Sequence, residues 1–145
     1  MSNIILLTHG DFSKGIAQSC RFILGEAANL IPLSITMETG IEEALGMLRD
    51  ALAKFEEEEP VIILTDIPGG STTQAAVRVL GDRNNLYLVS GMNLGLLIEL
   101  AVTEFDENRA GNEELIREAV EQAKSNLMLI SAAADGDVLG DDDEL

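Results

Sequence analysis

Three short apolar runs, each broken off by polar residues, most constrain how this chain can fold. They are residues 4–7, 61–64 and 86–89, built mainly from Ile, Leu and Val. A strand that is apolar without alternation is buried on both faces, as in a parallel sheet that helices cover on both sides. Residues 30–35 predict a fourth strand, which should lie at or near a sheet edge because Pro32 has no N–H to donate.

Between and after these strands, apolar residues recur at the spacing of a helix face. The first predicted helix follows a cap at Asp11 or Ser13 and ends at Gly25, and the second runs from about Thr39 to the acid run at 56–59. Two more span 73–80 and 93–105. The last follows a loop at 106–111 and a cap at Asn112 and ends at about Lys124. Strands that alternate with helices predict an α/β fold. We expect a doubly wound, mainly parallel four-stranded sheet with helices on both faces and right-handed crossovers.

The only histidine, His9, stands where the first apolar run ends. Open α/β sheets bind ligands outside the carboxyl ends of their strands, so this position makes His9 a candidate site residue. Gly10 follows it and allows a sharp turn and a close approach of a ligand to the backbone. Considered alone, His9 is explained equally well as a histidine that only satisfies a hydrogen bond at a strand end.

A second candidate motif follows the third strand: Asp66-Ile67-Pro68-Gly69-Gly70-Ser71-Thr72-Thr73. It offers a carboxylate, hydroxyl donors and the free N–H groups of a helix N-terminus, which suit a phosphate. The predicted phosphate-binding residues are Gly69, Gly70, Ser71 and Thr72, and the predicted rim consists of Gly10, Ile67, Pro68 and, after the fourth strand, Gly91, Met92 and Asn93. A plain strand-to-helix turn capped by Ser71 or Thr72 is the alternative.

The two motifs together predict a reaction that neither predicts alone. If the first and third strands are neighbours, as in the flavodoxin-like order, His9 faces the Asp66 loop across the point where the strand order reverses. A carboxylate that orients one imidazole nitrogen exposes the other as a nucleophile. We therefore predict that His9 and Asp66 are catalytic residues of phosphohistidine chemistry, with Ser71 and the loop N–H groups stabilising the phosphoryl group.

Composition narrows the possible partners. The 145 residues, 46% of them hydrophobic, fit one domain, which we assign to residues 1–134, followed by a disordered acidic tail at 135–145. A net charge of −17 argues against nucleic acid and anionic membrane surfaces as partners.

One Cys and one His exclude an internal disulfide and a standard zinc site, so we expect neither metal nor cofactor. Without an apolar run of membrane-spanning length or signal-peptide features, a cytoplasmic protein without membrane insertion is expected.

At this point residues 1 to about 131 resemble a known family, the enzyme IIA components of the mannose-type bacterial sugar phosphotransferase system, which serve mannose, fructose, sorbose or N-acetylgalactosamine. The resemblance rests on Thr8-His9-Gly10, on Thr65-Asp66 with Gly69-Gly70-Ser71 and Ala75-Ala76, and on Ser90-Gly91-Met92-Asn93 before a Leu-rich helix. It implies that His9 accepts a phosphoryl group from the phosphocarrier protein HPr and passes it to an enzyme IIB for sugar uptake. It also implies that Asp66 orients the His9 ring, while Gly70 and Ser71 hold the phosphoryl oxygens.

The chain departs from the family pattern at four positions. Members usually have a bulky apolar or aromatic residue at the position of Pro68, Pro at that of Thr72, Asn at that of Gln74 and often Pro at that of Gly95. These departures leave His9, Asp66 and the Gly-Gly-Ser motif intact and bear on the docking rim and the choice of partner.

Three other functions remain open. A dihydroxyacetone kinase phosphotransfer subunit is similar in the first strand, but its second motif lacks Gly-Gly-Ser. A regulatory domain would use phospho-His9 only as a signal. A flavodoxin-like nucleotide or flavin binder is disfavoured because the first loop lacks a phosphate cradle and only 3% of the residues are aromatic.

The apolar run Leu127–Ser131 follows the last predicted helix and needs a surface to bury it. It extends that helix or forms a fifth strand. The resemblance implies the second option: an antiparallel C-terminal edge strand that is exchanged between the subunits of a homodimer and pairs an open sheet edge.

Overall fold

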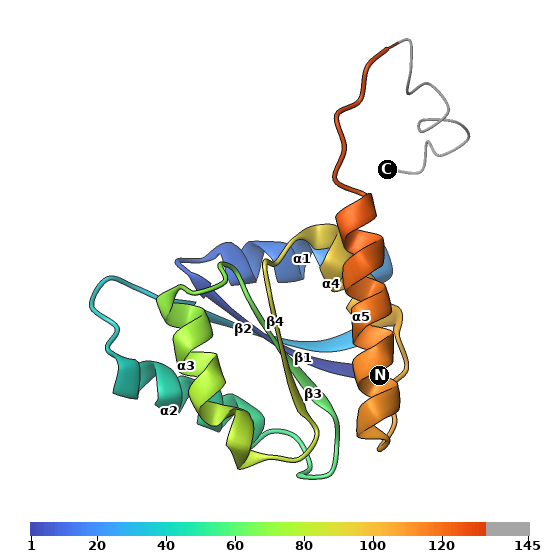
Figure 1. The fold of residues 1–145 in the computed structure, drawn as a ribbon. Helices are drawn as coiled ribbons and strands as arrows, with labels where there is room; N and C mark the ends of the chain where they lie inside the picture. Colours follow the sequence, from blue (N-terminus) through green and yellow to red (C-terminus); the bar gives the residue numbers. More distant parts are fainter. Residues whose placement is uncertain (133–145) are drawn as a thin grey trace.

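The computed structural model of the protein, which describes residues 1–132, contains a four-stranded parallel sheet between two layers of helices (Figure 1). The strands are β1 (Ser2–His9), β2 (Ala28–Ile35), β3 (Val61–Thr65) and β4 (Leu86–Ser90). The helices are α1 (Phe12–Leu24), α2 (Ile41–Leu52), α3 (Ser71–Val79), α4 (Leu94–Val102) and α5 (Arg109–Ser125), with the 3-10 helix η1 (Leu80–Asp82) after α3. The prediction of a doubly wound α/β fold is confirmed.

The strand order is β2-β1-β3-β4, and the pairs are all parallel. The chain lays β2 on one side of β1 and then crosses back to lay β3 on the other side. The order therefore reverses between β1 and β3, and the carboxyl ends of these two strands flank the switch point. β2 lies at an edge of the sheet, as Pro32 predicted.

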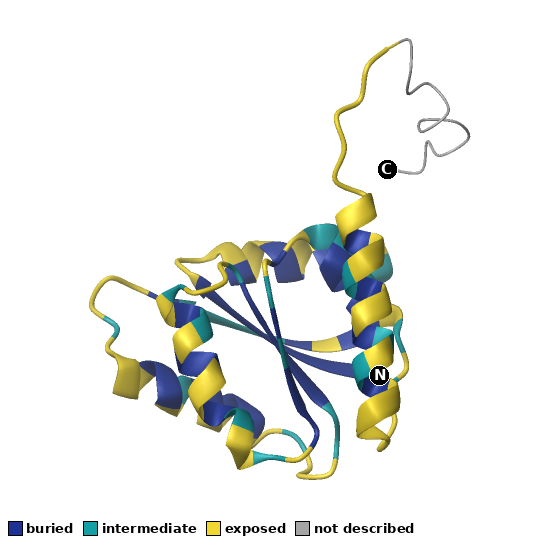
Figure 2. Ribbon diagram, viewed as in Figure 1, coloured by how far each residue is buried: buried dark blue, intermediate teal, exposed yellow. Residues whose placement is uncertain are grey.

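The strands are apolar without interruption because helices cover both faces of the sheet, and Figure 2 shows the buried strands between the two layers. On β1, Ile4 and Leu6 pack toward α1, α4 and α5, whereas Ile5 and Leu7 pack toward α2 and α3. All four side chains are fully buried. Successive side chains of a strand point to opposite faces, so a sheet covered on both sides needs no polar residue in alternation.

α2 ends at Leu52, short of the acid run at residues 56–59 that the sequence assigned to its end. The Phe55 N–H donates to the Leu52 carbonyl in a tight turn, and the Glu56 N–H then donates to the Glu59 side chain. Four acidic side chains in the last turn would be repelled by the negative end of the helix dipole, which favours a helix that ends before them.

α1 is capped from the preceding strand rather than by Asp11 or Ser13. The Ser13 N–H donates to the Thr8 hydroxyl at 2.8 Å, and Ser13 is itself buried. Asp11 has φ −89° and ψ 18°, which is not the extended conformation from which a side chain folds back onto the first turn.

α5 starts earlier than predicted because Asn108, and not Asn112, is its cap. The Asn108 side chain accepts a hydrogen bond from the Gly111 N–H at 2.9 Å. Asn112 is fully buried, and its amide donates to the Tyr87 hydroxyl at 3.0 Å and to the Asp106 carbonyl at 2.7 Å. Its side-chain oxygen also accepts from the Asp106 N–H at 3.1 Å, so every polar group of this buried amide is used in anchoring the loop before α5.

α3 and α4 differ from their predicted ranges only at their ends. α3 begins at Ser71, two residues before the predicted start, because Gly70 is its N-cap residue. α4 ends at Val102, three residues before the predicted end, where Thr103 turns to an extended conformation with ψ 136°.

Residues 127–130 form neither a helix nor a strand, so the single chain shows neither the extension of the last helix nor the fifth strand. Leu127 and Leu129 are 87% and 92% exposed. The acidic tail predicted at residues 135–145 lies outside the described residues. Over residues 1–132, no helix has both the length and the apolar character needed to cross a membrane.

We predict that Asn112→Ala lowers the free energy of unfolding by about 2–3 kcal/mol, because it leaves buried partners without hydrogen bonds. Asn108→Ala, which removes only the exposed cap, should cost about 1 kcal/mol. Urea unfolding followed by circular dichroism measures both. A loss for Asn112→Ala no larger than that for Asn108→Ala would contradict the anchoring role.

Candidate active site

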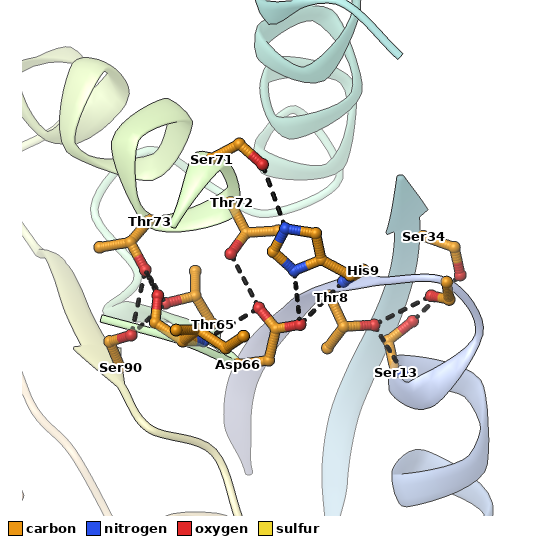
Figure 3. Close-up of polar contacts among 12 residues, drawn as sticks. Thr8, His9, Ser13, Ser34, Thr65, Asp66, Ser71, Thr72, Thr73 and Ser90 are labelled. Atoms are coloured by element: carbon orange, nitrogen blue, oxygen red, sulfur yellow. Dashed lines mark hydrogen bonds and ion pairs between the residues drawn. The ribbon is translucent and has the colours of Figure 1, made fainter. Parts of the chain in front are cut away.

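His9 stands at the carboxyl end of β1, where the chain turns away from the sheet. Gly10 makes this turn with φ 61°, a conformation that favours glycine, and its N–H donates to the Ile35 carbonyl of β2 at 2.8 Å. His9 continues the alternation of Ile5 and Leu7, so its ring lies on the side of α2 and α3 and meets the start of α3 (Figure 3). The side chain is 46% exposed, which leaves it accessible to a reactant.

Asp66, the residue after β3, holds His9 at two points (Figure 3). Its Oδ2 accepts hydrogen bonds from the backbone N–H and from the ring Nδ1 of His9, each at 2.9 Å. Its Oδ1 accepts from the Ile67 N–H at 3.0 Å and from the Thr72 hydroxyl at 2.8 Å. Within residues 1–132 the carboxylate therefore has four donors drawn from β1, the loop and α3.

These donors determine the charge of Asp66, whose side chain is only 10% exposed. Burial by itself raises the pKa of Asp66. The hydrogen bonds from the His9 backbone, the His9 ring and Thr72, together with the attraction of His9, outweigh burial and hold the pKa of Asp66 below its ordinary value. Asp66 is therefore ionised at neutral pH.

The ionised carboxylate fixes the tautomer of the His9 ring. A carboxylate accepts hydrogen bonds only, so we assign the ring proton to Nδ1, which lies 2.9 Å from Asp66 Oδ2. Nε2 then carries the free lone pair, and it lies 3.2 Å from the Ser71 hydroxyl oxygen. The ring thus presents a nucleophilic nitrogen to the N-terminus of α3.

The loop before α3 lies close against the ring because it contains glycines. Gly69 has φ 81°, and Gly70 is the N-cap residue of α3. A Cβ at Gly70 would lie 3.3 Å from the Ile67 carbonyl oxygen, which it would crowd, and 3.5 Å from His9 Cε1, which is ordinary van der Waals contact. The first turn of α3, whose N–H groups have no carbonyl partner within the helix, therefore comes next to Nε2.

A cluster of hydroxyl groups on the far side of the loop holds it in place, and the sequence did not reveal it. Thr73 donates to the Ile67 carbonyl at 2.7 Å, and the hydroxyl oxygens of Thr65, Thr73 and Ser90 lie 2.7–3.0 Å from one another. The strand register would have indicated this cluster, because Thr65 and Ser90 end β3 and β4 and lie opposite each other.

A cavity of about 470 Å³ lies beside the ring, and part of its wall was also missed. His9, Gly10 and Ser71 line it, together with four residues from the end of β2 and the connection to α2: Ile35, Thr36, Met37 and Thr39. The pairing of β1 with β2 places Ile35 opposite His9, so the strand order would have indicated this wall.

The predicted rim residues divide into two groups. Ile67 and Pro68 are exposed beside Asp66. Met92 is buried in the core, and the Asn93 side chain caps α4 by accepting from the Leu96 N–H at 2.8 Å.

Met92 and Asn93 line a separate cavity against α1 and do not line the one beside His9. The Gly91 and Met92 N–H groups both donate to the Thr65 carbonyl, which ties the end of β4 to that of β3. In the part of the chain that the structure describes, no three His, Cys, Asp or Glu side chains gather closely enough to hold a metal ion.

Comparison of the sequence with protein families gives a match at residues 3–126 to the family described as PTS system fructose IIA component. The PTS system fructose-specific EIIA component of Bacillus subtilis (strain 168) is 32% identical over 100 residues, which are 69% of this chain and 68% of that protein. The PTS system mannose-specific EIIAB component of Escherichia coli (strain K12) is 26% identical over 129 residues. These residues are 89% of this chain and 39% of that longer protein.

Comparison with solved structures leads to the same family. The mannose/sorbose specific IIA subunit of the phosphotransferase system from Enterococcus faecalis superimposes with a TM-score of 0.79 and 28% sequence identity. The match covers 90% of this chain and 95% of that structure. Family match, relatives and fold agree, and the chain belongs to the mannose-type family of PTS system IIA components, the phosphotransferase components that act in sugar uptake.

Proposed function

We propose that this protein is a phosphoryl carrier that accepts phosphate from phospho-HPr on Nε2 of His9 and passes it to an enzyme IIB. One observation carries the proposal: Asp66 holds Nδ1 at 2.9 Å while Nε2 faces Ser71 and the N-terminus of α3. A nucleophile, a group that orients it and a set of anion-binding donors meet at one point. The proposed partners place the protein in the cytoplasm.

The transfer step balances with the groups present. The Nε2 lone pair attacks phosphorus, and the P–N bond to the donor's histidine breaks as the N–P bond to His9 forms. The electron pair returns to the donor ring, which is protonated on its other nitrogen and leaves as a neutral imidazole. The Nδ1 proton of His9 stays in place, so Asp66 stabilises the positive charge that the phosphorylated ring acquires. In the second transfer His9 is the donor: the acceptor histidine of enzyme IIB attacks phosphorus, the N–P bond to His9 breaks, and the His9 ring returns to its neutral form with the proton on Nδ1.

The start of α3 is proposed to hold the phosphoryl oxygens. Their negative charge is spread over three atoms in the transition state, and preorganised donors stabilise it. Ser71, 3.2 Å from Nε2, supplies a hydroxyl at the point of attack, and the backbone at Gly70 can approach because no Cβ intervenes. The positive end of the α3 dipole adds to these donors.

We predict that His9→Ala accepts no phosphate, because the chain has no other imidazole. The protein is incubated with phosphoenolpyruvate, enzyme I and HPr, and acid-labile phosphate is measured by mass spectrometry. Unlabelled protein with an unchanged circular dichroism spectrum is the expected result. Labelling of the variant at the wild-type level would refute His9 as the acceptor. Adding enzyme IIB to the phosphorylated wild-type protein then separates a carrier, which loses its phosphate, from a regulatory domain, which keeps it.

We also predict that Asp66→Asn slows transfer by roughly 100-fold or more, because an amide can donate to Nδ1 and select the wrong tautomer. Asp11→Asn is the matched control, since Asp11 is exposed and pairs with Lys14 rather than with His9. Rapid-quench measurement of transfer from phospho-HPr compares the two variants. Equal rates would leave Asp66 with no part in catalysis.

A homodimer with an exchanged C-terminal strand is a further part of the proposal. Leu127 and Leu129 are exposed next to α5, and a chain in water gains by burying them. The edge of β2 is a poor acceptor for a strand, because Pro32 lacks an N–H and Arg21 already donates to the Leu30 carbonyl at 3.0 Å.

The free edge of β4 is the better acceptor. A cavity of about 370 Å³ lies there between η1 and α5, lined by Leu80, Leu86, Tyr87, Leu88, Arg109, Glu113, Ile116 and Arg117. Residues 127–130 of a second subunit can fill it as an antiparallel strand and so pair the open backbone groups of β4.

Truncation tests the exchange. A chain that ends at Lys124 should be a monomer or should aggregate, because it lacks the exchanged segment. A chain that ends at Ala134 keeps the segment and should remain a dimer. Sedimentation velocity distinguishes the two states, and a stable dimer of the chain that ends at Lys124 would exclude exchange through this segment.

A further inference from the structure

Thr72 makes a contact in the site that differs from the one its place in the motif suggested. It lies in the first turn of α3, its side chain is fully buried, and its hydroxyl donates to Asp66 Oδ1 at 2.8 Å. We propose that Thr72 is a positioning residue that fixes the Asp66 carboxylate in the orientation that holds the His9 ring. This inference rests on the proposed function, since it assigns the part that Thr72 plays in the transfer.

The hydrogen bonds separate Thr72 from the phosphate-binding groups. A hydroxyl has one proton to donate, and that of Thr72 is used on Asp66. Ser71, one residue earlier, has its oxygen 3.2 Å from Nε2 and so stands where the phosphoryl group forms. The two neighbouring hydroxyls therefore have different roles, because Ser71 faces the reacting atoms and Thr72 acts through Asp66.

Thr72 completes the set of donors around Asp66. An ionised carboxylate offers about four acceptor positions, and here they are taken by the His9 backbone N–H, the His9 ring, the Ile67 N–H and Thr72. Of the two donors on Oδ2, one is the ring that has to be held and the other is the His9 backbone N–H of β1. On the opposite oxygen, Oδ1, the described residues that donate are Ile67, through its backbone, and Thr72, through its side chain.

Removal of the hydroxyl has two physical consequences. Oδ1 keeps a single donor, and because the Asp66 side chain is 10% exposed, water does not freely replace the lost one. The Thr72 hydroxyl is also one of the groups that lower the pKa of Asp66, so its loss favours the protonated carboxyl. At neutral pH the carboxyl stays ionised, so the slower transfer comes from the lost donor that orients the carboxylate, and the raised pKa of Asp66 reports the same loss.

The pKa of Asp66 can be used to measure the loss of the Thr72 hydrogen bond, because few ionisable groups of the described chain act on this carboxyl. Among the described residues, His9 is the one charged or titratable side chain that acts on Asp66. The first turn of α3 and the end of β4 present the uncharged hydroxyls of Thr72, Thr73 and Ser90.

The test compares Thr72→Val, which keeps the shape of threonine and lacks the hydroxyl, with Thr72→Ser, which keeps the hydroxyl. We expect Thr72→Val to slow transfer from saturating phospho-HPr about tenfold, with the KM for phospho-HPr unchanged. The Asp66 carboxyl, followed by carbon NMR in the unphosphorylated protein, should titrate at higher pH in this variant. Thr72→Ser should stay within about twofold of the wild-type rate and retain the wild-type titration, because it keeps the donor.

Equal behaviour of Thr72→Val and Thr72→Ser in both measurements would overturn the proposal and leave Thr72 as a core residue. If Thr72→Val does not fold, Thr72→Ala against Thr72→Ser makes the same comparison. The NMR titration needs no phosphoryl transfer. If the wild-type protein accepted no phosphate, the proposed function would fail, while the titration would still decide whether Thr72 controls Asp66.

Discussion

The adjacency of β1 and β3 is the constraint on which the site depends. Parallel pairing sets Leu7 opposite Thr65, so the residues that follow, His9 and Asp66, emerge side by side at one edge of the sheet. They are 57 residues apart in the chain, yet their side chains meet at 2.9 Å. A strand between them would add about 4.8 Å and break the contact. The reversal of strand order at this point therefore brings His9 and Asp66 into contact.

Asp66 shows how the site keeps a charge in a nearly buried place. An unpaired carboxylate at this depth would be protonated or destabilise the fold. Here β1, the loop and α3 each contribute donors, so correct folding of all three is a condition for a stable charge. Because the pKa of Asp66 is lower in the folded chain than in the unfolded one, its hydrogen bonds stabilise the fold above the unfolded pKa. Their contribution is lost as the pH falls through the folded value.

The features that could be predicted from the sequence are those encoded in short patterns. Continuous apolar runs indicated the strands, and their ends indicated His9 and Asp66 as candidates that the switch point brings together. Features set by contacts between distant segments could not be read in this way. The buried amide of Asn112 looks like a helix cap in sequence, and the Thr72 hydroxyl looks like a phosphate ligand until its direction toward Asp66 is known. The wall formed by the β2–α2 connection needed the strand order as well as the pattern.

The charge of the chain and the chemistry of the site act at different distances. A net charge of −17 opposes the approach of a phosphoryl dianion, but salt screens separated surface charges beyond about 8 Å. At contact distance the local groups dominate: the Asp66 charge is shared among four donors, and the N-terminus of α3 turns its positive end toward His9. Gly70 lets this helix end come within reach of the ring. In the proposed function the binding of the phosphoryl group therefore depends on the groups around His9, and the overall charge acts on the approach of whole proteins.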